Sequence, residues 1–341
     1  MTKIFFSKNS IYNSKLVLID GFSGSGKILV AELLKAIKNT EIVKLETSFD
    51  HLPIIYNRGK IEKSAAISLL KTIFDKHVYY TNIGREINLR RKDLTFALDH
   101  PNKFKYLSSM FGNPLNDDLI TDQLSPKQIF PFMVHMSTFS NTLFEDGFHN
   151  INILYILRDP LFILETYSSY LNRISYDPRE FTPKVNYNGK DIPWYAEEWA
   201  EEYLRINNTE KSIILIDKCL DIFLKKLENN KMSKNIYKIL FFEDLVSKID
   251  KRFFEIESIF NQGYDRRCFN YIKRKNKVPR TSNQIEEGFW KRYTIKNISR
   301  QGDNEEIILK RTKAMISKYY FNKLLNLRDK YNNIKKTCLK D

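Results

Sequence analysis

The sequence predicts an α/β protein in which a central parallel sheet is flanked by helices. Residues 15–20 (KLVLID) form a short aliphatic run that is typical of a strand buried on both faces. A glycine-rich turn follows at once, and in residues 28–37 the apolar positions recur at helical spacing. Further apolar runs with strand character, separated by helical segments, occur at residues 42–45, 130–135, 151–157 and 237–242. Strands that alternate with helices indicate a parallel sheet covered on both faces.

The whole chain, residues 1–341, is predicted to form a single domain, because it has no internal repeat and no low-complexity linker. From about residue 58 to 125 the chain is mainly helical and carries no clear strand, which predicts an insertion between the second and third strands. Residues 186–191 (NYNGKD) indicate a loop, after which Pro193 opens a helix. The apolar pattern from about residue 304 to 335 predicts a closing amphipathic helical segment.

Composition excludes a wholly disordered chain, because 42% of the 341 residues are hydrophobic and 28% are charged. The 56 Lys and Arg outnumber the 41 Asp and Glu, and the formal net charge of +15 points to anionic partners. The alternative, that much of this excess is solvated surface, stays open. The three cysteines lie far apart without a CxxC pair, which suggests neither a disulfide framework nor a zinc site. Because no stretch approaches the roughly 20 apolar residues of a membrane span, we expect a cytoplasmic protein.

Residues 21–27 (GFSGSGK) match the pattern of a phosphate-binding loop between a strand and a helix. Glycines let the backbone curl so that N–H groups converge on phosphate oxygens, and a lysine adds a full positive charge. The predicted ligand-binding residues are Phe22, Ser23, Gly24, Ser25, Gly26 and Lys27. The position after Lys27 is Ile28, where kinases and ATPases carry the Ser or Thr that ligates magnesium. The loop therefore suits a phosphate-bearing ligand held by backbone and cations, with no metal required.

A second motif begins where the strand at residues 151–157 ends. Arg158 follows the strand and Pro160 opens a helix, so Arg158 lies at the carboxyl end of the sheet, where ligands of open α/β folds bind. Thr166 comes eight residues after Arg158, two helical turns on. This pattern resembles the 3′-phosphate-binding motif of sulfotransferases that use 3′-phosphoadenosine 5′-phosphosulfate (PAPS).

Other segments resemble the same family in the same order. Residues 239–245 (ILFFEDL) are similar to the family's late strand ending in Glu-Asp-Leu, while residues 280–282 (RTS) and 288–291 (GFWK) resemble the segment that folds over the adenine nucleotide. The resemblance implies a P-loop-type, three-layer sulfotransferase fold with helical insertions and PAPS as the donor. It implies that the loop at residues 21–27 binds the 5′-phosphosulfate and that Arg158 and Thr166 bind the 3′-phosphate. Arg280 and Lys291 are then further candidates for nucleotide binding.

Two positions depart from the family pattern. Phe22 stands where many sulfotransferases have a lysine just before the loop core, which leaves that role to Lys27. The family's Arg-Lys-Gly element ahead of Gly-x-Trp-Lys is also missing, and Arg280, Lys291 and Arg300 are possible substitutes.

Sulfuryl transfer needs a base that takes the proton from the acceptor. His135 ends a predicted strand 23 residues before Arg158, a place and spacing similar to those of the catalytic histidine of cytosolic sulfotransferases. His135 and Lys27 are therefore the predicted catalytic residues. Two alternatives stay open: that His135 is a satisfied core histidine, and that a carboxylate is the base, with Glu46, Asp50 and Glu86 as the leading candidates.

The acceptor, expected to be a small molecule or a glycan with a hydroxyl or amine, is less defined. Residues 84–91 (GREINLRR) could contact it, and Trp194, Tyr195 and Trp199 could stack on a sugar ring, but a solvated face and a packed core are the commoner explanations of such segments. Two other functions stay open: a P-loop kinase in which Asp159 or Asp244 holds magnesium, and a non-enzymatic polyanion-binding protein. No nucleic-acid-binding module is recognisable, and the sequence does not define the oligomeric state.

Overall fold

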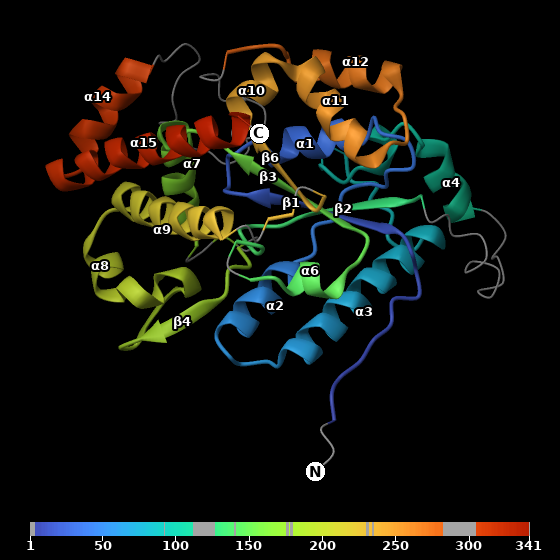
Figure 1. Cartoon of the computed structure of the whole chain (residues 1–341), viewed down its shortest axis with the longest axis horizontal. Coiled ribbons are helices and arrows are strands. Elements are labelled where there is room, and N and C mark those ends of the chain that lie inside the picture. The colour runs from blue at the N-terminus through green and yellow to red at the C-terminus, as the bar shows by residue number, and fades with distance from the viewer. Residues whose placement is uncertain are drawn as a thin grey trace.

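A parallel sheet with the strand order β2-β1-β3-β6 forms the centre of the described part of the molecule (Figure 1). The computed structural model describes residues 4–91, 93–111, 127–139, 141–174, 177, 180–229, 232–233, 235–281 and 305–340. Its strands are β1 (Lys15–Gly21), β2 (Ile129–Met133), β3 (Ile151–Leu157) and β6 (Tyr237–Phe241). The predicted α/β class with a central parallel sheet is confirmed.

Both faces of the sheet are buried, as alternating side chains along β1 show. Leu16 and Leu18 point into one apolar cluster, and Val17 and Ile19 point into the other; all four are fully buried. The first face is covered by α3 (Lys63–Asn82), α6 (Leu143–Gly147), α7 (Pro160–Leu171) and α9 (Asn208–Glu228). The second is covered by α1 (Lys27–Leu34), α10 (Phe242–Ser247), α11 (Ile249–Phe260) and α12 (Arg266–Lys275). This burial explains why the strands are continuous apolar runs.

The strand predicted at residues 42–45 is not formed. Residues 40–44 pair with β2 through two isolated bridges only, from Thr40 to Ile129 and from Lys44 to Phe132. The backbone N–H groups of Glu41 and Lys44 do donate to carbonyls of β2, but Pro131, at the centre of β2, has no N–H to return a bond. The hydrogen-bond ladder is therefore interrupted between the two bridges.

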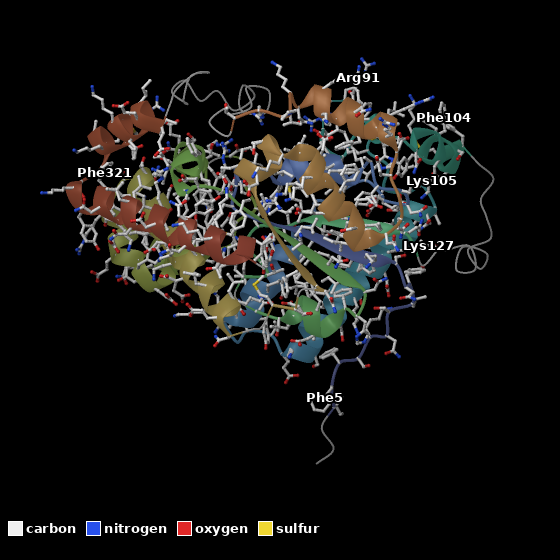
Figure 2. All side chains as sticks on the ribbon, turned by 45° about the horizontal axis from the view of Figure 1, so that its top comes forward. Phe5, Arg91, Phe104, Lys105, Lys127 and Phe321 are labelled. Carbon is white, nitrogen blue, oxygen red and sulfur yellow. The ribbon has the colours of Figure 1, made fainter. Side chains whose placement is uncertain are left out.

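The described part of the chain between this segment and β2 is mainly helical. Its helices are α2 (Ser48–Asn57), α3, the short 3₁₀ helix η1 (Ala97–Asp99) and α4 (Lys103–Phe111). Phe104 on α4 is 74% exposed, and Phe5 lies on the N-terminal segment that runs away from the body of the molecule (Figure 2).

Residues 184–193 form a hairpin, although residues 186–191 were predicted from the sequence to form a loop. β4 (Lys184–Tyr187) and β5 (Lys190–Pro193) pair antiparallel, and both turn residues, Asn188 and Gly189, have positive φ angles of 49° and 79°. This is the backbone conformation that an Asn-Gly turn favours. After Pro193 the chain forms a 3₁₀ helix, η2 (Trp194–Trp199), and then α8 (Ala200–Arg205).

The last described elements are α14 (Glu305–Met315) and α15 (Lys318–Lys340). α15 packs beside α7 and α9, so this late segment lies close to the helix that follows β3 (Figure 1). Among the described residues, no helix combines the length and apolarity needed to cross a bilayer.

Candidate functional site

Three glycines shape the loop between β1 and α1. Gly21, Gly24 and Gly26 have φ angles of 143°, 83° and 106°, a region that other residues rarely adopt. All three also permit close contacts. A Cβ on Gly21 would lie 2.5 Å from the carbonyl oxygen of Ile156, one on Gly24 would lie 2.6 Å from Cγ2 of Thr166, and one on Gly26 would overlap the ring of Phe242. The glycines therefore bring the loop against α7 on one side and α10 on the other.

Unpaired donors of this loop suit a phosphate group. Among the described residues, no acceptor is present for the backbone N–H groups of Gly24, Gly26 and Lys27. The hydroxyl of Ser25 is buried and has no hydrogen-bond partner within the same residues. Buried polar groups are normally satisfied, and these donors lie at the amino terminus of α1, where an anion is stabilised. The loop thus fits the nucleotide phosphate that the sequence predicts.

Lys27 lies at the base of the loop and is 5% exposed. Its ammonium group donates to the carbonyl oxygens of Gly21, at 2.8 Å, and of Val134, at 2.7 Å. Burial lowers the pKa of Lys27 to about 8, although the negative charges of Asp20 and Asp50 act in the opposite direction. Lys27 joins the phosphate-binding loop to the end of β2, where His135 follows Val134.

Arg158 lies beside the loop, as its place at the end of β3 predicts. Parallel pairing sets Gly21 opposite Ile156, two residues before Arg158. The guanidinium Nη1 donates to the carbonyl oxygen of Gly24 at 2.9 Å, and the guanidinium carbon lies 4.2 Å from the ring centroid of Phe242. The two motifs that the sequence analysis found separately therefore meet in space.

Thr166 and Arg280 also lie near the loop. Thr166 is buried on α7, and its side chain packs against Gly24 of the loop. The backbone N–H of Arg280 donates to the carbonyl of Val246 on α10, the helix that packs on Gly26. Lys291 and Arg300 lie outside the described residues, as do residues 288–291 as a whole.

His135 lies at the end of β2, next to the loop, and its side chain is 52% exposed. Asp50 on α2 accepts from the backbone N–H of His135 at 2.7 Å and lies 3.0 Å from its ring Nδ1. Because a carboxylate can only accept, Nδ1 carries the proton, and in the neutral ring Nε2 is then the nitrogen with the lone pair. Asp50 also accepts from the hydroxyl of Ser137 at 2.6 Å. Burial opposes ionisation of Asp50, but the charge and hydrogen bonds of His135 and the bond from Ser137 lower its pKa overall. His135 is thus an accessible, oriented histidine, not a core residue.

The other two carboxylates considered as bases are already bound. Glu46 lies 2.8 Å from Nε2 of His77 and Glu86 lies 2.6 Å from its Nδ1. The hydrogen bond from His77 is the main cause that lowers the pKa of Glu46 to about 2. A carboxylate that holds its negative charge so firmly is a poor proton acceptor near neutral pH.

The sequence analysis missed Asp20. Its fully buried carboxylate accepts from the backbone N–H groups of Gly21, Met136 and Thr138, and from the Thr138 hydroxyl. It therefore connects the start of the phosphate-binding loop to the turn that carries His135. An acidic residue at the end of an apolar strand was the available signal, because a buried charge needs such partners.

The aromatic residues proposed to stack on a sugar divide into two groups. Trp199 is buried in the apolar core and its indole N–H donates to the carbonyl of Tyr195, so it is a packing residue. Trp194 is partly exposed, and the guanidinium carbon of Arg58 lies 5.9 Å from its ring centroid. In the segment at residues 84–91, Arg85 packs over the ring of Tyr80 at 4.8 Å.

The carboxylates proposed to hold magnesium in a kinase are paired with cations. Asp159 binds Arg328, at 2.7 Å from Nη2, and Asp244 binds Arg252 at 3.2 Å and Lys335 at 3.3 Å. No group of three or more metal-ligating side chains is found in the described parts of the chain.

No family model matches the chain, and no curated protein matches it in sequence. Several solved structures are similar to it in fold, and three of them illustrate the likeness. The sulfotransferase domain of an olefin synthase from Synechococcus PCC 7002 aligns over 96% of this chain and 98% of its own, at 12% identity and a TM-score of 0.42.

A sulfotransferase domain from the curacin biosynthetic pathway aligns over 75% of this chain and 76% of its own, at 12% identity and a TM-score of 0.40. A sulfotransferase from Mycobacterium avium aligns over 78% and 68%, at 7% identity and a TM-score of 0.37. These three structures are all sulfotransferases or sulfotransferase domains.

Proposed function

We propose that this protein is a PAPS-dependent sulfotransferase that transfers a sulfuryl group to the hydroxyl or amine of a small molecule or glycan. The observation that carries the proposal is the meeting of two anion-binding features on Gly24. The carbonyl of Gly24 accepts from Arg158, and its α-carbon packs on Thr166, while its N–H is available to a ligand. A nucleotide with phosphates at both the 5′ and 3′ positions has the two separated charges that such a site suits.

In this proposal the loop at residues 21–27 binds the 5′-phosphosulfate and Lys27 stabilises the charge that develops on the leaving phosphate oxygen. Arg158 and Thr166 bind the 3′-phosphate, and Arg280 contributes a further positive charge. When bound, PAPS supplies an activated sulfuryl group: the acceptor atom bonds to sulfur while the bond from sulfur to the 5′-phosphate oxygen breaks. Adenosine 3′,5′-bisphosphate leaves.

His135 is the proposed base. Its Nε2 takes the proton that the acceptor hydroxyl or amine loses, and Asp50 holds the ring in the tautomer that leaves Nε2 unprotonated. The same carboxylate stabilises the imidazolium that results. This arrangement favours His135 over Glu46 and Glu86, which are both held by His77.

A nucleotide kinase is less well supported. Ile28 provides no hydroxyl for a metal, and the two nominated carboxylates, Asp159 and Asp244, each face basic side chains. The charge of +15 also fits simple polyanion binding, which would not discriminate among nucleotides.

A thermal-shift comparison tests the proposal with adenosine 3′,5′-bisphosphate, with ATP plus magnesium and with ADP. Selective stabilisation by the bisphosphate is expected, of about 2.7 kcal/mol when the ligand is present at 100 times its Kd. Stabilisation by ATP that EDTA abolishes would instead support the kinase. Equal stabilisation by all three nucleotides, lost as salt rises, would support polyanion binding.

A further inference from the structure

Asp159, the residue after Arg158, contacts both α7 and α15 through its carboxylate. One of its carboxylate oxygens caps α7 by accepting from the N–H of Leu161 at 2.9 Å. The guanidinium of Arg328 on α15 binds both oxygens, with Nε 3.0 Å from Oδ1 and Nη2 2.7 Å from Oδ2. The exposed fraction of the side chain is 10% for Asp159 and 16% for Arg328. A two-pronged, mostly buried pair of this kind fixes direction as well as distance.

The backbone between Arg158 and Asp159 is held from a second side. The N–H of Asp159 donates to one oxygen of Glu243 at 3.0 Å, and the hydroxyl of Tyr331 on α15 donates to the other. Glu243 lies in the first turn of α10, two residues after the end of β6, so this carboxylate joins the ends of β3 and β6.

A single face of α15 makes all these contacts. Arg328, Tyr331 and Lys335 are separated by three and four residues, which places them on one side of a helix. They meet Asp159, Glu243 and Asp244 respectively, which are the acidic residues that follow the two strand ends. Figure 1 shows α15 crossing α7, the helix that follows β3, and the two helices are in contact.

We propose that Arg328 is a positioning residue for the nucleotide site and that the Asp159–Arg328 pair aims Arg158. The side chain of Arg158 binds the carbonyl of Gly24, and Arg328 of α15 holds the next residue, Asp159. If Asp159 is released, the backbone that carries Arg158 is no longer fixed. The pair therefore sets the preference for nucleotides that carry a 3′-phosphate over those that do not. This inference rests on the proposed function, because it assigns Arg158 to the 3′-phosphate.

The test measures the Kd of adenosine 3′,5′-bisphosphate and of adenosine 5′-monophosphate by calorimetry for the unchanged protein and for Arg328→Gln. We expect the preference for the bisphosphate to fall about tenfold or more, the size seen when a residue that orients a binding group is lost. Affinity for the monophosphate should stay within about threefold, because the loop at residues 21–27 is not touched. A general loss of packing would lower both affinities together.

Lys330→Gln is the matched control. Lys330 lies on the same helix but binds Asp217 and Asp221 of α9, so its loss removes ion pairs from α15 without reaching Asp159. The Lys330→Gln variant should keep the preference for the bisphosphate. Asp159→Asn should reduce this preference. The double variant of Asp159→Asn and Arg328→Gln should lose no more of the preference than the more severe single variant, because the two residues act as one unit. If Arg328→Gln does not fold, Arg328→Lys, which cannot make the two-pronged contact, takes its place.

Three results would overturn the inference. If the unchanged protein prefers the bisphosphate and the Arg328 variant keeps that preference, the inference alone fails. It also fails if both affinities fall in parallel in the variant. If the unchanged protein shows no preference for the bisphosphate, the proposed function fails together with it.

Discussion

Asp50 binds His135 twice, once through the backbone N–H and once through the ring. The Asp50 carboxylate therefore fixes both the backbone position of His135 and the orientation of its imidazole ring. Because Asp50 comes from α2 and His135 from the end of β2, the contact also joins the helical region after β1 to the sheet. About half of the His135 side chain is exposed, so an acceptor can reach the imidazole.

Replacing Asp50 with Asn should lower kcat by about 100-fold or more with little change in donor affinity, because the amide can favour the wrong tautomer of His135. The activity is measured as release of adenosine 3′,5′-bisphosphate from PAPS with a panel of phenols, amines and sugars. Ser137→Ala is the control: it removes another hydrogen bond to Asp50 but keeps both bonds to His135. Equal losses in the two variants would contradict the orienting role.

Affinity for adenosine 3′,5′-bisphosphate should decline as the pH rises above about 8. Lys27 has a pKa of about 8 in the free protein, whereas a bound phosphate favours the charged form and raises that pKa. Above pH 8, binding must therefore take up a proton, which weakens affinity by up to about tenfold per pH unit. Calorimetry between pH 7 and pH 9.5 measures this. Lys27→Met should bind more weakly at pH 7 and lose the pH dependence; a slope unchanged in this variant would assign the titration to another group.

Removing the guanidinium of Arg158 should weaken binding of the bisphosphate by about 2 to 5 kcal/mol, the loss typical of a buried charge-paired partner. Arg158→Ala and Arg158→Lys are compared by calorimetry, with adenosine 5′-monophosphate as the matched ligand. The lysine variant should recover part of the loss, since it keeps the charge but not the planar fork. Unchanged affinity in Arg158→Ala would refute the assignment of this residue to the 3′-phosphate.

Gly24→Ala should destabilise the protein more than Gly59→Ala. Both glycines have positive φ angles, 83° and 63°, so the backbone strain of about 1 kcal/mol is shared. Only the new methyl group at residue 24 meets a neighbour, Cγ2 of Thr166 at 2.6 Å, whereas nothing lies within 4 Å at residue 59. Urea unfolding measures the difference. Adding Thr166→Ser, which removes Cγ2, should restore part of the loss in Gly24→Ala; no restoration would show that the contact is not the cause.

Stability should fall between pH 5 and pH 3 partly through Glu46. Its pKa is about 2 in the folded protein, mainly because of the hydrogen bond from His77, and about 4.3 when unfolded. The folded state therefore binds fewer protons, so this stabilisation is present above about pH 4.3 and is lost as the pH falls toward 2. Glu46→Gln should flatten the decline by about 1 to 3 kcal/mol in urea unfolding at these pH values. A decline as steep as that of the unchanged protein would contradict this role.

The sequence predicted the features that depend on neighbouring residues. The strand, the glycine turn and the helix at residues 15–37 form one continuous signal, and Pro160 marks the start of α7. The meeting of Arg158 with the loop follows from these, because adjacent parallel strands end at one edge of a sheet.

Contacts between distant residues could not be predicted in the same way. Arg328 and Asp159 are 169 residues apart, and the pattern of α15 shows only an amphipathic helix, not the partner of its charged face. The structural role of Asp20 likewise depends on hydrogen bonds from the turn at residues 136–138, more than 100 residues later. The hairpin at β4 and β5 was different: the Asn-Gly pair was visible, but it was interpreted as a loop.

Pro131 interrupts the row of backbone donors at the β2 edge of the sheet. Of the strands that the structure describes, β2 is the outermost on its side, and an outer strand with a full row of backbone donors and acceptors can pair with a strand of another molecule. Here Pro131 removes a donor from the middle of that row, and residues 39–44 already form hydrogen bonds with backbone groups of β2 on both sides of it. The interruption that prevented a fifth strand from forming thus also makes this border a poor template for intermolecular β-pairing and fibril growth.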